Sequence, residues 1–340
     1  LPPSPTHLEC RHVMTEDTPA RTTRRHWTQT VAGTTLASLA SRDFALAGST
    51  VLKAGELTAT IGDNSGTETH RPGYNGIWSL QHAAANRSLF VPGIAGLNLE
   101  HIVNGTPLDN DDLYIEPRKA PKTLQQLDET SCELHQPPTP ATHLESRTRF
   151  VLQPGGILDM HFECWPRRDL FPHGYLSLFW ASYINAPQDR SMYFLGSLDS
   201  QPAGWCQLCT QFHNDQSTVL HRQDQFKAAF EPDNRSALFR NFSRLRFDQP
   251  FFYGRFDDLT WLVLFSKSDG IRLTHSPSGG GFNTVLRSHN PAWDFQFLIR
   301  EPKVSQSYGF SVRTILQPAV DRNQMVQLAE QWQKERAGTV

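Results

Sequence analysis

Polar and apolar side chains alternate between residues 150 and 164, and this feature restricts the fold of the chain more than any other. In FVLQPGGILDMHFEC, two runs of strand-forming residues flank a Pro-Gly-Gly turn at residues 154–156. Such a period of two gives a strand one apolar and one polar face. The outward series is Ile157, Asp159, His161 and Glu163, and the inward series is Leu158, Met160, Phe162 and Cys164. The pattern predicts a half-buried β-hairpin.

Similar signals recur along the chain. We expect further strands over residues 56–61, 259–265, 293–299 and 308–316, separated by loops such as residues 62–66. A C-terminal helix over residues 320–336 is predicted to pack on a sheet through Met325, Leu328, Ala329 and Trp332. Many short strands in a chain with 22 Gly and 23 Pro indicate an all-β fold. We predict a large antiparallel β-sandwich of the supersandwich or jelly-roll type, with residues 48–340 as a single domain.

The stretch RTTRRHWTQTVAGTTLASLASRDFALAG, residues 21–48, is organised like an export leader. Arg24 and Arg25 precede a weakly apolar run, and Ala-Leu-Ala at residues 45–47 fits the small-x-small site of a signal peptidase. Thr-Arg-Arg-His-Trp resembles the twin-arginine export signal. Residues 1–47 are therefore interpreted as two parts. The first lies upstream of the translated protein, which would start at Met14, and the second is a twin-arginine signal peptide. An amphipathic N-terminal helix is the alternative.

Composition removes several function classes. The formal net charge is −2 and no basic run occurs, which argues against nucleic acid as a partner. No run after residue 48 is apolar for long enough to anchor the processed chain in a membrane.

Cys206 and Cys209 have the spacing of zinc ligands or of a redox pair, but no second cysteine pair follows, and ordinary thiols are the favoured interpretation. Walker, HExxH, GxSxG and Rossmann motifs are missing from the sequence.

Instead, aromatic residues cluster with Asn, Arg, Glu and His in loop-rich segments. A sugar has an apolar face that stacks on aromatic rings and hydroxyls that need paired donors and acceptors, so this combination suits carbohydrate. The clusters are HRPGYNG (70–76), GLNLEH (96–101), YIEPR (114–118), FWASYIN (179–185), FYGR (252–255), THSPSGGG (274–281) and NPAWDFQ (290–296).

These segments resemble an uncharacterised family of exported bacterial proteins with twin-arginine leaders. The shared phrases are YNGIWSL, GLNLEHI, LFWASYINAP, FFYGR, THSPSGGG and NPAWDFQF, over most of residues 61–320. The resemblance implies no established activity. The strand pattern is also similar to the mutarotase-like supersandwich of sugar epimerases, lyases and some glycosidases, although a fold does not fix a function.

Glu100 and His101 lead the candidate catalytic residues. A regular strand places Asn98 and Glu100 on one face and His101 on the other, so an acid–base pair needs a bulge or loop that turns both inward. A surface Glu beside a His held by the backbone is the alternative. The candidate catalytic residues are Glu100, His101, Tyr183, Arg118 and His275.

The candidate substrate-binding residues are Tyr74, Asn75, Trp180, Asn185, Tyr253, Arg255, Trp293 and Asp294. Trp180 is the expected stacking platform. Arg118 and Arg255 suit a uronate carboxylate, which arginine binds in a bidentate manner, or else form structural ion pairs with Glu116 and Asp257. His161, Glu163 and His173 have ligand chemistry, but exposed strand polarity explains them more simply.

The sequence therefore predicts a periplasmic or secreted protein, exported by the twin-arginine machinery, that cleaves or modifies a polysaccharide or oligosaccharide. Hydrolysis needs two carboxyl groups, Glu100 with Glu116 or Asp294. A lyase needs a base such as Tyr183 or His101, with an Arg or a metal on the uronate. A non-catalytic glycan-binding module and a metal-dependent periplasmic enzyme are the alternatives. No cofactor is expected, and a divalent metal stays open.

Overall fold

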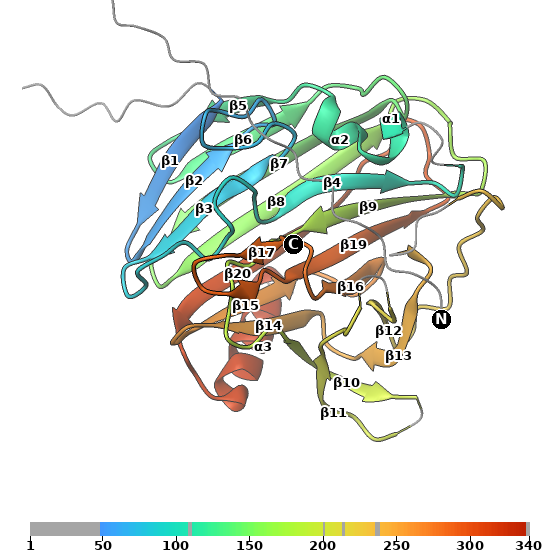
Figure 1. Cartoon of the computed structure of the whole chain (residues 1–340). Coiled ribbons are helices and arrows are strands. Elements are labelled where there is room, and N and C mark those ends of the chain that lie inside the picture. The colour runs from blue at the N-terminus through green and yellow to red at the C-terminus, as the bar shows by residue number, and fades with distance from the viewer. Residues whose placement is uncertain (1–47, 108–110, 200, 213–214, 235–238, 338–340) are drawn as a thin grey trace, which may run out of the picture. The chain divides into compact units, whose positions relative to one another are not determined.

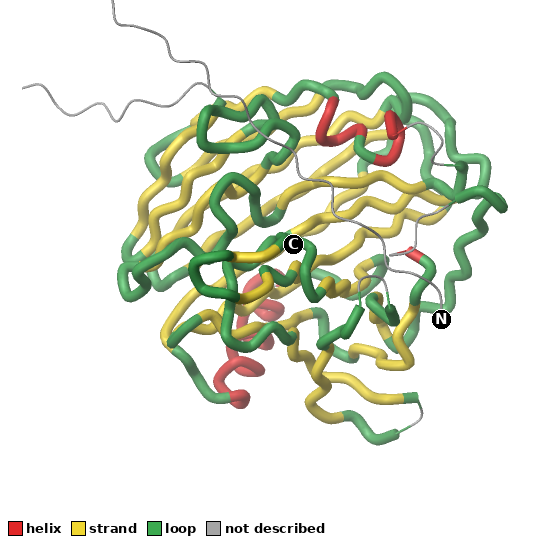
Figure 2. The backbone as a smooth tube through the Cα atoms, in the orientation of Figure 1, coloured by secondary structure: helices red, strands yellow, loops and turns green. Residues whose placement is uncertain are grey.

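The computed structural model describes residues 48–107, 111–199, 201–212, 215–234 and 239–337. The predicted export leader lies outside these residues. Most of the chain is in strands or in the loops between them, as Figure 2 shows, and the long helix is α3 (Arg322–Ala337). Two single-turn helices, α1 (Asp111–Tyr114) and α2 (Glu116–Lys119), follow the fourth strand. No helix in these ranges is long and apolar enough to cross a membrane.

Within the described residues the strands form three sheets (Figure 1). The small sheets are β1 (Ser49–Ala54), β2 (Leu57–Gly62) and β3 (Gly76–His82), and the pair β17 (Phe282–Asn283) and β18 (Ser288–His289). In spatial order the large sheet is β4 (Asn98–Val103), β9 (Tyr175–Ala181), β19 (Ala292–Arg300), β16 (Ile271–Ser276), β12 (Thr218–His221), β13 (Phe242–Phe247), β10 (Met192–Leu198), β14 (Phe251–Phe256), β15 (Leu259–Phe265), β20 (Tyr308–Pro318), β8 (Ile157–Pro166), β7 (Leu144–Gln153), β6 (Ser131–Gln136) and β5 (Thr123–Gln126), with β11 (Gly204–Leu208) beside β10.

The large sheet closes over its own core. β9 and β8 lie far apart in the strand order, yet the ring of Trp180 packs edge-on against Phe162 with ring centres 4.7 Å apart. Phe295 of β19 meets Phe265 of β15 at 4.9 Å and Phe310 of β20 at 5.7 Å. Two parts of one curved sheet therefore face each other and enclose a shared aromatic core. The predicted all-β sandwich is confirmed, with one departure from antiparallel pairing, because β12 and β13 are parallel.

The helix and the hairpin also agree with the sequence. α3 packs through Met325, Ala329 and Trp332 on the outer side of β14, β15 and β20. β7 and β8 flank the Pro-Gly-Gly turn and pair antiparallel. Along β8, Met160 and Phe162 are buried while His161 and Glu163 face outward.

The strands β4, β9 and β19 carry the site. On β9, Leu176, Leu178 and Trp180 point into the shared core, whereas Tyr175 and Phe179 belong to a second cluster on the opposite face. Aromatic side chains of the segment after β12 cover part of that second cluster. The polar residues of the candidate site lie on this second face of the sheet.

Candidate active site

A β-bulge in β4 turns two neighbouring polar side chains to one face. Leu99 pairs with Trp180 and His101 pairs with Phe179, so Glu100 is the extra residue between them. His101 then packs against the Phe179 ring, and Glu100 lies beside it on the same face. The bulge that an acid–base pair requires is thus present, and without it the strand period would separate the two side chains.

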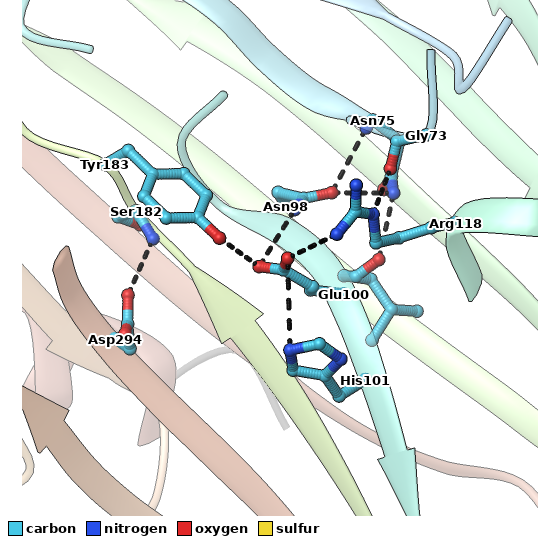
Figure 3. Close-up of polar contacts among 10 residues, drawn as sticks. Gly73, Asn75, Asn98, Glu100, His101, Arg118, Ser182, Tyr183 and Asp294 are labelled. Carbon is cyan, nitrogen blue, oxygen red and sulfur yellow. Dashed lines mark hydrogen bonds and ion pairs between the residues drawn. The ribbon is translucent and has the colours of Figure 1, made fainter. Parts of the chain in front are cut away.

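Glu100 is the centre of a hydrogen-bonded network (Figure 3). Arg118 donates from Nη1 to Oε1 at 2.9 Å, and the Tyr183 hydroxyl donates to Oε2 at 2.6 Å. Asn98 adds a longer bond from Nδ2 to Oε2 at 3.4 Å. The Glu100 side chain is only 4% exposed, whereas that of Arg118 is 22% exposed. A carboxylate removed from water to this degree needs such charge-assisted partners.

α2 and the loop before β3 position Arg118. The buried carboxylate of Glu116 accepts hydrogen bonds from the hydroxyls of Thr139 and Thr142, which fixes the start of the helical turn. Arg118 then donates from Nε to the carbonyl of Gly73 at 3.1 Å, and its guanidinium lies 4.1 Å from the centre of the Tyr74 ring. The predicted alternative that Arg118 pairs with Glu116 is wrong, because Arg118 pairs with Glu100.

Asn75 holds the bulge itself. Its backbone N–H and side-chain amide both donate to Oδ1 of Asn98, at 3.1 and 2.8 Å. The same amide donates to the carbonyl of Leu99 at 2.9 Å. Asn75 is 3% exposed, and its N–H groups hold the bulged strand. The structure thus gives Asn75 a positioning role, and its predicted contact with substrate stays a prediction.

His101 is neutral at physiological pH. Burial lowers its pKa to about 4, and Arg118 lowers it too, against the opposing effects of Glu100 and the backbone of Tyr114. The ring stacks on Tyr114 with centres 3.8 Å apart, and Nε2 lies 3.9 Å from Oε1 of Glu100. Nδ1 is buried, and no group among the described residues meets it with the geometry of a hydrogen bond. The imidazole thus keeps one ring nitrogen without a well-aligned partner in the protein.

The pKa values of Tyr183 and Asp294 are both raised near the Glu100 carboxylate. Burial raises the pKa of Tyr183 well above its ordinary value, and the charge of Glu100 raises it further. Burial also raises the pKa of Asp294, and Glu100 adds to this, although Ser182 N–H donates to Oδ1 at 2.9 Å and opposes the shift. The Glu100 carboxylate therefore lies near a phenol and a carboxyl group whose pKa values are raised, and near an imidazole whose pKa is lowered. Groups with pKa values pushed apart in this way are typical of acid–base chemistry.

The structure brings together seven of the predicted site residues, which are Glu100, His101, Arg118, Tyr183, Asp294, Tyr74 and Asn75. Tyr74 is half-buried, and the edge of its ring meets Tyr183 with centres 5.9 Å apart. Tyr114, which stacks on His101, belongs to the predicted cluster YIEPR but was not among the predicted site residues. It ends α1, and Arg118 lies in α2, so both short helices bring a side chain to β4.

His275 and Trp293 lie in the core and not at this site. His275 Nε2 is 2.8 Å from the carbonyl of Arg190, and its Nδ1 is 2.8 Å from the hydroxyl of Thr210. Trp293 donates to the same Arg190 carbonyl at 2.9 Å. Both side chains are fully buried and their polar atoms are satisfied. Their position corrects the predicted catalytic and substrate-binding roles.

Trp180 also has no face for a sugar. It is fully buried, stacked on Phe295 at 5.3 Å and flanked edge-on by Phe162 and Phe310. The predicted platform is a core residue, because the alternate residues of β9 face opposite sides and Trp180 points inward.

The remaining predicted substrate-binding residues lie away from the Glu100 network. Tyr253 is buried under α3, where its hydroxyl accepts a hydrogen bond from Arg322 at 3.0 Å. Arg255 is exposed at the end of β14, and Asp257 pairs with Arg87 at 2.6 Å instead. Asn185, which is 5% exposed, donates to the Ser88 carbonyl at 3.3 Å and accepts from Asn283 at 3.2 Å. None of these side chains contacts the Glu100 network.

Within the described residues no three His, Cys, Asp or Glu side chains are grouped as metal ligands. His161 is hydrogen-bonded to Ser311 at 2.9 Å, whereas His173 pairs with Glu231 at 3.2 Å. Cys206 and Cys209 are free thiols.

No family model matches the chain, and no curated protein matches it. The resemblance to the exported bacterial family thus stays a prediction. Solved structures with a similar fold include a putative aldose 1-epimerase from Escherichia coli, 11% identical over 80% of this chain and 99% of that one, with a TM-score of 0.48. An aldose epimerase homologue from C. elegans is 10% identical over 80% and 100%, with a TM-score of 0.47. A heparinase III is 8% identical over 82% of this chain and 36% of that one, with a TM-score of 0.44. At TM-scores below 0.5 these likenesses carry no argument about function, which rests on the site.

Proposed function

We propose that the protein is a carbohydrate-active enzyme and that Glu100, Tyr183, His101 and Arg118 form its catalytic centre. The bulge at Glu100 carries this proposal, because it turns a carboxylate and an imidazole to one face where a phenol and a guanidinium meet them. Bulges that redirect side chains are common next to active sites. A purely structural ion pair needs only Glu100 and Arg118 and would not require Tyr183 and His101 to be turned toward the same carboxylate.

Elimination on a uronate-containing glycan is the reaction that these groups support best. A base removes the proton at C5 beside the carboxylate, the C4–O4 bond breaks, and an acid protonates the departing O4. The neutral His101 imidazole supplies a lone pair, and the protonated Tyr183 hydroxyl supplies a proton. Arg118 is partly exposed, so its guanidinium can face the uronate while it holds Glu100.

Hydrolysis is the second candidate, and Asp294 is the observation that favours it. A glycosidase uses one protonated and one ionised carboxyl group. Burial raises the pKa of Asp294 and so favours its neutral form, and the nearby charge of Glu100 adds to that shift. Glu116 does not serve, because Thr139 and Thr142 occupy its carboxylate.

The test is product formation by the purified protein on a panel of uronate-containing and neutral polysaccharides. Elimination yields unsaturated products that absorb in the ultraviolet, whereas hydrolysis yields reducing ends without that absorbance. Tyr183→Phe should lower turnover on the order of a hundredfold or more. Tyr253→Phe is the matched control, because it removes a buried hydroxyl under α3 that has no contact with Glu100.

Two outcomes would contradict the proposal. If Tyr183→Phe and Tyr253→Phe retain equal, wild-type turnover, the catalytic centre is elsewhere. If the protein binds a glycan of the panel but releases no product from any of them, it is a non-catalytic binding module. We also propose that the protein is exported to the periplasm or secreted, on the order of the parts in residues 21–48.

A further inference from the structure

A polar groove lies on the outer face of the large sheet, away from the Glu100 network. Its volume is about 780 Å³, and strands β6, β7, β8 and β20 supply most of its lining. His161 and Glu163 of β8 point into this groove, whereas Phe162 between them is mostly buried in the shared core. None of the residues that line it belongs to the Glu100 network. A cavity of this size is in the range that binds small ligands.

Positive charge exceeds negative charge in the lining. The cations are Arg147, Arg149, Arg167, Lys267 and Arg336, and the acids are Glu133, Glu145 and Glu163. Glu133 is paired with Arg147 at 3.7 Å, and Glu145 is paired with Arg167 at 2.7 Å. Glu163 accepts a hydrogen bond from Ser307.

Three of the five cations in the lining have no acidic partner at ion-pair distance. Arg149, Lys267 and Arg336 form no ion pair within 4 Å among the residues that the structure describes. Lys267 lies over the Phe297 ring and is near Asp269, and Arg336 lies over the Trp332 ring. Five cations against three acids leave the lining with a net positive charge, which favours an anionic ligand.

Arg149, His161 and Ser311 form one cross-strand row on the groove floor. Arg149 is opposite His161 on the neighbouring strand, and His161 is opposite Ser311 on the next. Partial burial lowers the pKa of His161, and the charges of Arg336 and Arg149 lower it further, against the effect of Asp159. Arg336, at the end of α3, lines the same groove as this row. One carboxylate or sulfate group could meet both arginines there.

The rest of the groove suits a sugar. Trp165 is half-buried in the lining, and Ser266, Ser307 and Ser311 offer hydroxyl groups. Gly309, which pairs with Glu163, has no side chain to fill the floor, and a Cβ there would approach the Phe162 carbonyl to 2.4 Å. Three acidic side chains make the lining a poor surface for a polyphosphate. A ring with hydroxyls and a single acidic group fits this mixture better.

We propose that the groove between β7, β8, β20 and the end of α3 binds an acidic oligosaccharide, with its carboxylate or sulfate at Arg149 and Arg336 and a sugar ring near Trp165. This site is separate from the proposed catalytic centre. In an enzyme that acts on a polymer it would hold part of the chain away from the reacting bond.

The experiment is calorimetric titration of the full chain with three probes, namely trigalacturonate, a sulfated heparin disaccharide and neutral maltotriose. We expect at least one acidic probe to bind more tightly than maltotriose and to weaken as salt rises from roughly 50 to 200 mM. The double variant Arg149→Ala/Arg336→Ala should bind that probe at least about tenfold less tightly. Arg255→Ala, which removes an exposed arginine outside the lining, should bind like the wild type.

The Glu100→Gln variant separates the two proposals. It should retain the acidic probe in the groove even if it has lost all turnover. The groove proposal is wrong if no acidic probe binds, if maltotriose binds equally well, or if the double arginine variant binds unchanged. It is also wrong if Glu100→Gln abolishes the binding, which would place the ligand at the catalytic centre.

Discussion

Replacing Arg118 with Met should destabilise the protein strongly, since it leaves the buried Glu100 carboxylate without its cation. The Glu100 side chain is 4% exposed and receives its only described charged hydrogen bond from Arg118 Nη1, at 2.9 Å. Breaking a buried ion pair by removing one partner costs about 3–5 kcal/mol. Arg118 is itself 22% exposed, so we expect a value near the lower end, about 3 kcal/mol. The lost bond to Gly73 and the contact with Tyr74 contribute to that value.

The assay is urea unfolding of Arg118→Met, Glu100→Gln and the double variant. The double variant should be more stable than Arg118→Met, because the amide that replaces the Glu100 carboxylate carries no charge and can still bond to Tyr183 and Asn98. Arg244→Met is the control, since the pair of Arg244 with Asp199 is exposed and solvent screens it, so its loss should change stability little. If Arg118→Met costs no more than this control, Glu100 is not held as a desolvated carboxylate and the reasoning fails.

Three further predictions concern the core, acid stability and export. Trp180→Ala should lower the free energy of unfolding by about 3–5 kcal/mol, and equal stability in denaturant would contradict its core position. Burial lowers the pKa of His275 to about 4, so on acidification the unfolded chain takes up the proton first. Stability should therefore fall between roughly pH 6.5 and 4, with about 2 kcal/mol lost from this group by pH 5. His275→Gln should show a smaller acid loss, and an unchanged pH profile would refute this. Replacing Arg24 and Arg25 with Lys should retain the protein in the cytoplasm, whereas normal export and processing would refute the twin-arginine assignment.

The sequence predicts the framework of this fold well where a strand has one buried face. Along β8 the period of two identifies the outward residues, and the apolar spacing of α3 identifies Met325, Ala329 and Trp332 as its packing face. The same pattern fails on β9 and β15, which are buried along their whole length. A strand covered on both sides has no alternation to read. Nothing in the sequence of β9 therefore separates a core tryptophan from a ligand-stacking one, and Trp180 faces the core.

The site is only partly predictable, because its geometry depends on local irregularities. The bulge at Glu100 adds one residue to β4, and no residue type in Asn98-Leu99-Glu100-His101 requires it. Its cause is tertiary, since Asn75 from a separate segment binds Asn98 and the Leu99 carbonyl. The partner of Arg118 could not be chosen from the sequence either, because Glu116 is two residues away and Glu100 is 18.

The account depends most on the claim that the groups bonded to Glu100 act in the reaction, with Glu100 setting their charge and position, and do not serve the fold alone. The direct measurement compares Glu100→Gln with the wild type in two assays, calorimetric affinity for a cleaved polymer and the rate of product formation on it. Gln keeps the shape of the side chain and removes its charge, so an effect on the transition state alone should leave affinity within about threefold and lower turnover by roughly a hundredfold or more. Wild-type turnover in a folded Glu100→Gln protein would contradict the central claim.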